Sequence, residues 1–209
     1  LFVSHNMVSI ETLCNQAILL DKGKIVFRGD ASSTIDRYLQ GKSDQKLTKV
    51  DLTSHDGRKK GKTVSATGKK IFQSIELLDK RNKNSSVFEI GDTILFRIKL
   101  NNSVVDYDSP NIMISIYDRS DTMIISLNTS QMNFKIKDRG FVNFQLDNCR
   151  LTPGYYSVHL NYKSTGKNLM SDAIRDAITF RILDKAFKSG VSFHKDSQCV
   201  AEGKWDFNK

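Results

Sequence analysis

The sequence predicts a mainly β protein: an antiparallel sandwich of the immunoglobulin or jelly-roll type, preceded by a short α/β segment. Two features of residues 70–209 indicate the sandwich. Apolar and polar residues alternate, and turn residues interrupt this alternation every ~8 to 15 positions. No amphipathic helix separates the alternating segments, which favours antiparallel pairing. The strand candidates are 71–79, 93–100, 112–117, 123–127, 141–146, 155–162 and 178–183.

Residues 1–40 are predicted as a separate α/β segment. Its order is a strand end at 1–3, a helix at 7–16 and a hairpin with strands at 17–21 and 24–28. Lys22-Gly23 form the hairpin turn, and Asp30 or Ser32 can cap a last helix through Leu39. Because the chain begins inside an apolar run without an initiator Met, we expect it to be a fragment of a longer protein.

Residues 41–69 have the polar composition of a linker. Residues 41–70 hold nine Lys and Arg against three Asp, so +6 of the net charge of +9 lies there. A basic arm for nucleic acid or lipid headgroups is the alternative. The segment has no aromatic residue to stack on a base or to anchor at an interface. We therefore predict a flexible linker at 41–69 and a folded domain at 70–209.

The cysteines and the hydropathy pattern indicate a reduced, soluble protein. Cys14, Cys149 and Cys199 are odd in number, far apart and without CxxC spacing, which favours free thiols in the cytoplasm. The sequence shows no apolar run of the length that spans a membrane and no signal-peptide pattern.

The N-terminal motifs resemble a known family. They are LFVSHNM at 1–7, LLDKGKI at 19–25, Gly29-Asp30 and Tyr38-Leu39. In this order they resemble the end of an ABC-transporter ATPase domain, and the resemblance makes His5 the switch histidine that contacts the γ-phosphate. The phosphate loop, signature loop and Walker B carboxylates are absent from the sequence, so we expect no activity and no cofactor for this chain alone. ATP and Mg²⁺ are expected in the complete parent subunit.

A second resemblance covers residues 70–209. Its pieces are IELLD at 75–79, FEIGD at 88–92, the strand at 112–118, LNT at 127–129, LTPGYY at 151–156 and GKW at 203–205. Together they resemble the C-terminal domain of Wzt-type ATPases of O-antigen exporters, a sandwich that recognises the finished lipopolysaccharide glycan. The resemblance implies a membrane permease partner at the inner face of the cell membrane. It also implies a homodimer, through docking of a tail that holds Trp205 and Phe207.

The residues themselves do not favour catalysis or metal binding by the sandwich. Histidines 5, 55, 159 and 194 lack metal-ligand spacing, and no Gly-x-Ser-x-Gly elbow occurs. Most of the aspartates that could form a glycosidase pair fall at predicted strand ends or in turns, where Asp is common.

The alternation nominates a polar surface for glycan. Rings stack on the C–H faces of sugars, and amides or charged groups pair with their hydroxyls. The candidate glycan-binding residues of this parity are Arg97, Lys99, Tyr117, Asn143, Gln145, Tyr155, His159 and Asn161. An ordinary solvated face or a dimer contact is the alternative for each of them.

A non-catalytic glycan-recognition domain is the predicted function. Two alternatives stay open: a structural dimerisation module of the transporter without glycan affinity, and a basic nucleic-acid-binding protein. Binding that weakens steeply with salt would indicate the latter.

Overall fold

The computed structural model describes residues 2–3, 10, 13–43, 48–58, 70–101, 111–129, 140–163, 170–183 and 199. The first elements of the chain are β1 (Gln16–Asp21), β2 (Lys24–Asp30), α2 (Ala31–Ser43) and β3 (Lys49–Asp51). The other strands are β4 (Phe72–Asp79), β5 (Val87–Glu89), β6 (Ile94–Leu100), β7 (Asn111–Asp118), β8 (Met123–Asn128), β9 (Phe141–Leu146), β10 (Gly154–Lys163) and β11 (Met170–Leu183).

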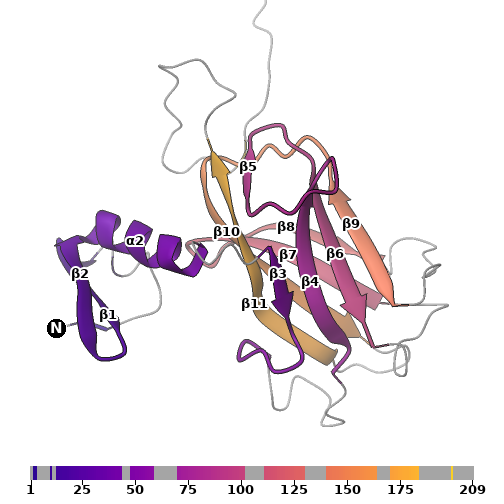
Figure 1. Ribbon diagram of the computed structural model, residues 1–209, viewed down its shortest axis with the longest axis horizontal. Coiled ribbons are helices and arrows are strands. Elements are labelled where there is room, and N and C mark those ends of the chain that lie inside the picture. The colour runs from indigo at the N-terminus through magenta and orange to yellow at the C-terminus, as the bar shows by residue number, and fades with distance from the viewer. Residues whose placement is uncertain are drawn as a thin grey trace, which may run out of the picture.

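Two sheets form the predicted sandwich. One sheet has the strand order β5-β11-β10-β7-β8 and the other has the order β3-β4-β6-β9. Figure 1 shows β4, β6 and β9 in front of β7, β8 and β10, with the hairpin and α2 to one side. All pairings are antiparallel except that of β11 with β5. The predicted fold class is confirmed.

Alternating apolar side chains from both sheets fill the space between them. Phe180 of β11 packs against Phe88, Phe96 and Tyr156, with ring centroids 5.5 to 6.2 Å apart. Phe96 also stacks on Phe144 across the pairing of β6 with β9. Since apolar residues of this parity point inward from both sheets, the polar parity of each sheet points outward. The two outer faces therefore lie on opposite sides of the sandwich.

The predicted hairpin and helix before the sandwich are present. Strands β1 and β2 pair through the turn at Lys22 and Gly23, both at positive φ. Asp30 caps α2, because its carboxylate accepts a hydrogen bond from the Ser33 N–H at 2.8 Å. The prediction of an apolar strand end at residues 1–3 is wrong for Phe2 and Val3, which lie outside any strand and are exposed.

Every strand predicted from alternation is present. Six of the seven agree with their predicted bounds to within one residue, whereas β11 begins eight residues before the predicted start at 178. Turns at Asn82, Gly91 and Asp121 have positive φ, the conformation that Asn, Asp and Gly tolerate. The short strands β3 and β5 and the first half of β11 were not predicted. Strand β3 has three residues and pairs with β4, and β5 has three residues and pairs with β11. The unpredicted part of β11 is residues 170–177.

The prediction of a flexible linker at 41–69 is wrong for residues 48–58, which we call the strap. Its strand β3 pairs with β4, and Leu52 is fully buried. The Arg58 guanidinium forms an ion pair with Asp172, which is only 2% exposed, and donates to the carbonyls of Leu52 and Phe72. The Asp172 carboxylate also accepts the N–H groups of Ile71 and Phe72 at 2.8 and 3.0 Å. The strap thus belongs to the sandwich.

Candidate functional site

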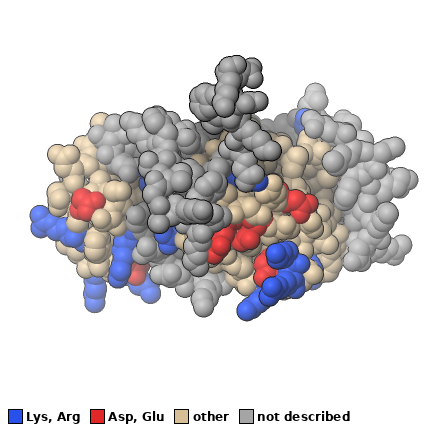
Figure 2. Space-filling view, turned by 90° about the horizontal axis from the view of Figure 1, so that it is seen from above, with Lys and Arg blue, Asp and Glu red and all other residues tan. Residues whose placement is uncertain are grey.

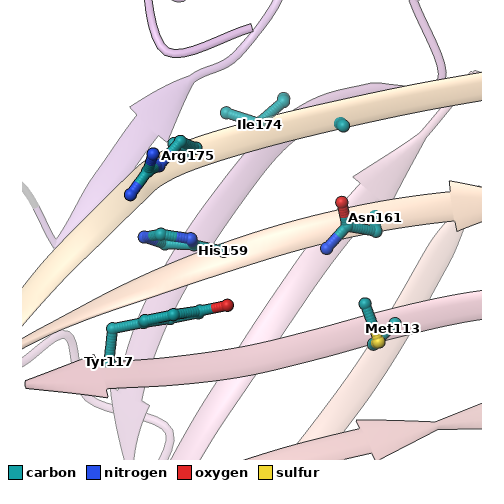
Figure 3. A pocket seen from close by; sticks show the side chains of 7 residues that line it. Met113, Tyr117, His159, Asn161, Ile174 and Arg175 are labelled. Atoms are coloured by element: carbon teal, nitrogen blue, oxygen red, sulfur yellow. The ribbon is translucent and has the colours of Figure 1, made fainter. Parts of the chain in front are cut away.

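A hollow of about 180 Å³ lies on the outer face of the five-stranded sheet. Three neighbouring strands, β7, β10 and β11, supply its walls (Figure 3). Its lining residues are Met113, Tyr117, His159, Asn161, Ala173, Ile174 and Arg175. One water molecule occupies roughly 30 Å³ in the liquid, so this space suits a single small polar unit.

A β-bulge in β11 builds one side of the hollow. Val158 pairs with Ile178 and Leu160 pairs with Ile174, so β11 advances four residues where β10 advances two. Asp176 lies within this bulge at a φ of 49°. Bulges re-aim the side chains beside them, and this one directs Asp176 to His159 and Arg175 to Asp121.

The strap supports the same side of the hollow. The N–H of Arg175 donates to the carbonyl of Gly57 at 2.9 Å, and Arg58 forms a β-bridge with Ile174. A Cβ on Gly57 would lie 2.1 Å from the carbonyl oxygen of Arg175. Only glycine therefore permits this approach of the strap to β11.

His159 forms the centre of one wall. Its ring stacks on that of Tyr117 with centroids 4.0 Å apart and an interplanar angle of 18°. Figure 3 shows His159 between Tyr117 and Arg175, which explains why a residue of outward parity is only 6% exposed. The faces of the imidazole are thereby covered, so its edge is the part that faces the hollow.

The charged groups beside the hollow are paired with one another. Nε2 of His159 lies 3.3 Å from Oδ1 of Asp176, and this hydrogen bond is the main reason that the pKa of Asp176 is lowered to about 2. Nη2 of Arg175 lies 2.7 and 2.5 Å from the two carboxylate oxygens of Asp121, and this contact raises the pKa of Arg175. The Asp176 carboxylate is therefore charged at neutral pH.

The neutral polar groups of the hollow are, by contrast, unpaired. Within the described part of the chain, the Tyr117 hydroxyl, the Asn161 amide and Nδ1 of His159 have no hydrogen-bond partner. Because a carboxylate only accepts, Nε2 carries the hydrogen toward Asp176, and Nδ1 of the neutral ring is an acceptor. Donors and acceptors without charge are thus available together at one place (Figure 3).

The arrangement does not form a catalytic relay. Ser157 Oγ and Asp176 Oδ1 both contact Nε2 of His159, each at 3.3 Å. A relay needs the nucleophile and the carboxylate on different ring nitrogens. No group of three or more His, Cys, Asp or Glu is placed to hold a metal ion among the residues that the structure describes.

The predicted glycan-binding residues do not form one surface. Tyr117, Tyr155, His159 and Asn161 are on the five-stranded sheet, whereas Arg97, Lys99, Asn143 and Gln145 are on the four-stranded sheet. The prediction of a single face is therefore wrong, because the outer faces of the two sheets point in opposite directions. Only Tyr117, His159 and Asn161 line the hollow.

The remaining predicted residues have other surroundings. Tyr155 lies beneath the Arg181 guanidinium, 5.1 Å from its ring centroid, and its hydroxyl is buried without a partner among the described residues. Arg97 lies 3.8 Å from Glu76 on the opposite face. His5, Trp205 and Phe207 lie outside the described residues.

Sequence reasoning missed Met113 and Arg175, and it considered Asp176 only as a glycosidase carboxylate and set it aside. The alternation of β11 stops at residues 175–177, where the bulge shifts the register, so the segment did not resemble a strand. The signal that remained was the pair Arg175-Asp176 between the apolar pairs Ala173-Ile174 and Ala177-Ile178. Two short apolar runs separated by two charged residues are compatible with a bulged strand.

The sandwich matches the model of a known domain family. The fold defines an antiparallel β-sandwich domain, and the model of the Wzt C-terminal domain matches residues 61–194. The chain therefore belongs to the Wzt C-terminal domain family. It carries the C-terminal domain of an ABC exporter ATPase subunit of the polysaccharide-exporting type. A comparison with curated protein sequences gives no match.

Three solved structures are similar to the chain. The crystal structure of the C-terminal domain of Wzt is 14% identical with a TM-score of 0.45, covering 69% of this chain and 87% of that chain. The PmoD soluble domain from Methylocystis sp. ATCC 49242 (Rockwell) is 9% identical, with a TM-score of 0.33, over 54% of this chain and 96% of that chain. The endo-beta-1,4-mannanase from Thermotoga petrophila is 16% identical, with a TM-score of 0.30, over 57% of this chain and 22% of that chain.

No helix in the described part of the chain is long and apolar enough to cross a membrane. Figure 2 shows Lys and Arg over the left part of the view, which holds the hairpin and α2. On the sandwich in that view, acidic and basic groups lie side by side. That view of the sandwich shows no continuous basic patch of the kind that nucleic-acid-binding proteins present.

Proposed function

We propose that the sandwich recognises a cell-surface polysaccharide and that the hollow on its five-stranded sheet binds one sugar unit. The observation that carries this proposal is the set of unpaired neutral groups on Tyr117, His159 and Asn161. A sugar hydroxyl both donates and accepts, so the Nδ1 acceptor, the Asn161 amide and the phenol can each bond to it. The buried unpaired atoms among the described residues are Arg58 Nε and the Tyr155 hydroxyl, so water reaches the three groups of the hollow and a sugar would take its place.

The rest of the exporter follows from family membership as part of the same proposal. Residues 1–40 are the end of the ATPase domain, His5 is its switch histidine, and the complete subunit holds ATP and Mg²⁺. The subunit associates with a membrane permease at the cytoplasmic face, forms a homodimer and exports O-antigen or a related polysaccharide. Four exposed apolar side chains on the hairpin support the assignment of residues 1–40 to the end of the ATPase domain, because such a patch is typical of an interface. They are Ile18, Leu20, Ile25 and Val26.

A dimerisation module without glycan affinity is the second candidate. Strand β8 is an edge of the five-stranded sheet, and its Met123 and Leu127 are exposed. An exposed apolar edge strand can pair with a second copy. The two functions are compatible, so glycan binding has to be measured directly.

The deciding experiment is a titration of the chain with a panel of bacterial polysaccharide fragments. We expect a dissociation constant on the order of micromolar to millimolar for the cognate fragment. Its value should change little between about 50 and about 500 mM salt, whereas nucleic-acid binding would weaken by orders of magnitude. Failure of every fragment to bind, together with a stable dimer, would support the structural module instead.

A further inference from the structure

The charged groups beside the hollow leave no cation for an acidic ligand. Arg175 is the one basic side chain among the residues that line the hollow, and Asp121 occupies its guanidinium at 2.5 and 2.7 Å. Asp176 stands on the same bulge, and its side chain is 66% exposed. Apart from the His159 imidazole, the ionisable groups beside the hollow are thus two carboxylates and one guanidinium.

An acidic sugar would therefore meet two obstacles. Its carboxylate or phosphate would have to compete with Asp121 for the guanidinium of Arg175, the side chain that proteins use to bind such groups. It would then lie close to Asp121 and Asp176, whose negative charges would repel it. A hydroxyl or an ammonium group meets neither obstacle, since both can donate to a carboxylate oxygen, which accepts more than one hydrogen bond.

We propose that the hollow selects uncharged or amino-bearing sugar units and rejects uronic acids and phosphorylated sugars. Asp121 and Asp176 are the residues that set this specificity, by holding Arg175 and by repelling anions. This inference rests on the proposed function, because it concerns the ligand of the same hollow.

The test uses pairs of probes that differ by one carboxylate. The methyl glycosides of glucose, mannose and galactose are each compared with the corresponding uronic acid at neutral pH. The readout is the NMR shift of the Asn161 side-chain amide, which lines the hollow and is unpaired. We expect at least one neutral member to bind and its uronic acid to bind at least about tenfold more weakly.

Variants then locate the cause of the discrimination. Asp121→Asn should free Arg175 and bring uronic acid affinity to within about threefold of the neutral sugar, and adding Arg175→Ala should remove that gain. Asp121 is 58% exposed, so its replacement should leave the fold intact. Asp176→Asn should also reduce the difference in affinity between the neutral sugar and its uronic acid. Asn tolerates the positive φ of this position, so the substitution should not strain the backbone. Glu76→Gln is the matched control, since Glu76 pairs with Arg97 on the opposite face.

Each outcome decides between the proposals. Uronic acids that bind as tightly as their neutral partners would overturn the charge selection and leave the glycan site in place. Discrimination that survives Asp121→Asn and Asp176→Asn unchanged would overturn the assignment of these residues. If no neutral or acidic sugar shifts the Asn161 amide, the glycan function of the hollow fails, and the inference fails with it.

Discussion

The carbonyl of Gly57 accepts a hydrogen bond of 2.9 Å from the N–H of Arg175, and so joins the strap to the wall of the hollow. This contact connects the strap to the bulge that directs Arg175 and Asp176. The shape of the hollow thus depends on residues about 120 positions apart in the sequence.

Gly57→Ala tests the closeness of this contact. The added Cβ would lie 2.1 Å from the Arg175 carbonyl oxygen and 2.9 Å from the His55 ring, so the strap must move away from β11. We expect a loss of about 2 kcal/mol or more in the free energy of unfolding, measured by urea denaturation. Gly154→Ala is the control, because its Cβ would have no atom nearer than 3.8 Å and should change stability by less than about 0.5 kcal/mol. Equal effects of the two variants would contradict the close approach.

A second prediction concerns the buried ion pair that fastens the strap. Asp172→Asn leaves the Arg58 guanidinium buried without a counter-charge and should cost about 3–5 kcal/mol of stability. The double variant Arg58→Met with Asp172→Asn should recover most of the loss, because Asn still accepts the N–H groups of Ile71 and Phe72.

The exposed pair on the four-stranded sheet is the control for this effect. Glu76 and Arg97 are 19% and 35% exposed, so Glu76→Gln should cost less than about 1 kcal/mol. An Asp172→Asn variant that unfolds at the same urea concentration as Glu76→Gln would show that the strap is not fastened by its ion pair.

The strap also shows where composition fails as a predictor. The composition of residues 41–69, averaged over 29 residues, is that of a linker. Single side chains such as Leu52 and Arg58 make the contacts of the strap, and the average conceals them. The partner of Arg58 is 114 positions away, beyond any local pattern. Alternation succeeded for β4, β6, β7 and β10 because each has one face in the core, and it failed in β11 because a bulge changes the register.

The candidate site could be predicted only in part for a related reason. Parity placed Asn161 and Tyr117 correctly on an outer face, but parity does not reveal to which sheet a strand belongs. The predicted glycan surface therefore combined residues of β6 and β9 with residues of β7 and β10, although these two pairs of strands belong to different sheets on opposite sides of the sandwich. His159 was predicted as a surface side chain, and the rings and charges of its neighbours cover it.

The pKa of Asp176 gives a third prediction. The value is lowered from 3.8 to about 2 in the folded chain, mainly by the hydrogen bond with His159. A carboxyl group whose folded pKa is lowered stabilises the protein above its unfolded pKa, and this contribution is lost as the pH falls through the folded value. The wild type should therefore lose more stability than Asp176→Asn between about pH 4 and about pH 2. Urea midpoints of the two proteins that stay parallel across this window would show that Asp176 is not held by His159.

The last prediction separates the two outer faces of the sandwich as glycan sites. Tyr117→Phe removes only the unpaired hydroxyl of the hollow, and Asn161→Ala removes its unpaired amide. Each change should weaken binding of the cognate fragment by about 0.5–1.5 kcal/mol, which is between two- and tenfold, because a sugar hydroxyl loses its partner. Stability should change by less than about 0.5 kcal/mol, since neither group bonds to another described residue.

Asn143→Ala and Gln145→Ala are the matched controls on β9 of the four-stranded sheet. Both side chains are exposed, and both were equally good candidates from the sequence. Asn143 is the closer match to Asn161, because the Gln145 amide donates to Asp147 at 2.8 Å. Affinity measured by calorimetry should be unaffected in these two variants. If instead Asn143→Ala and Gln145→Ala weaken binding while Tyr117→Phe and Asn161→Ala do not, the glycan lies on the four-stranded sheet, and the free groups of the hollow serve another ligand. A loss shared by all four variants would require a polysaccharide that wraps around the edge of the sandwich and contacts both faces.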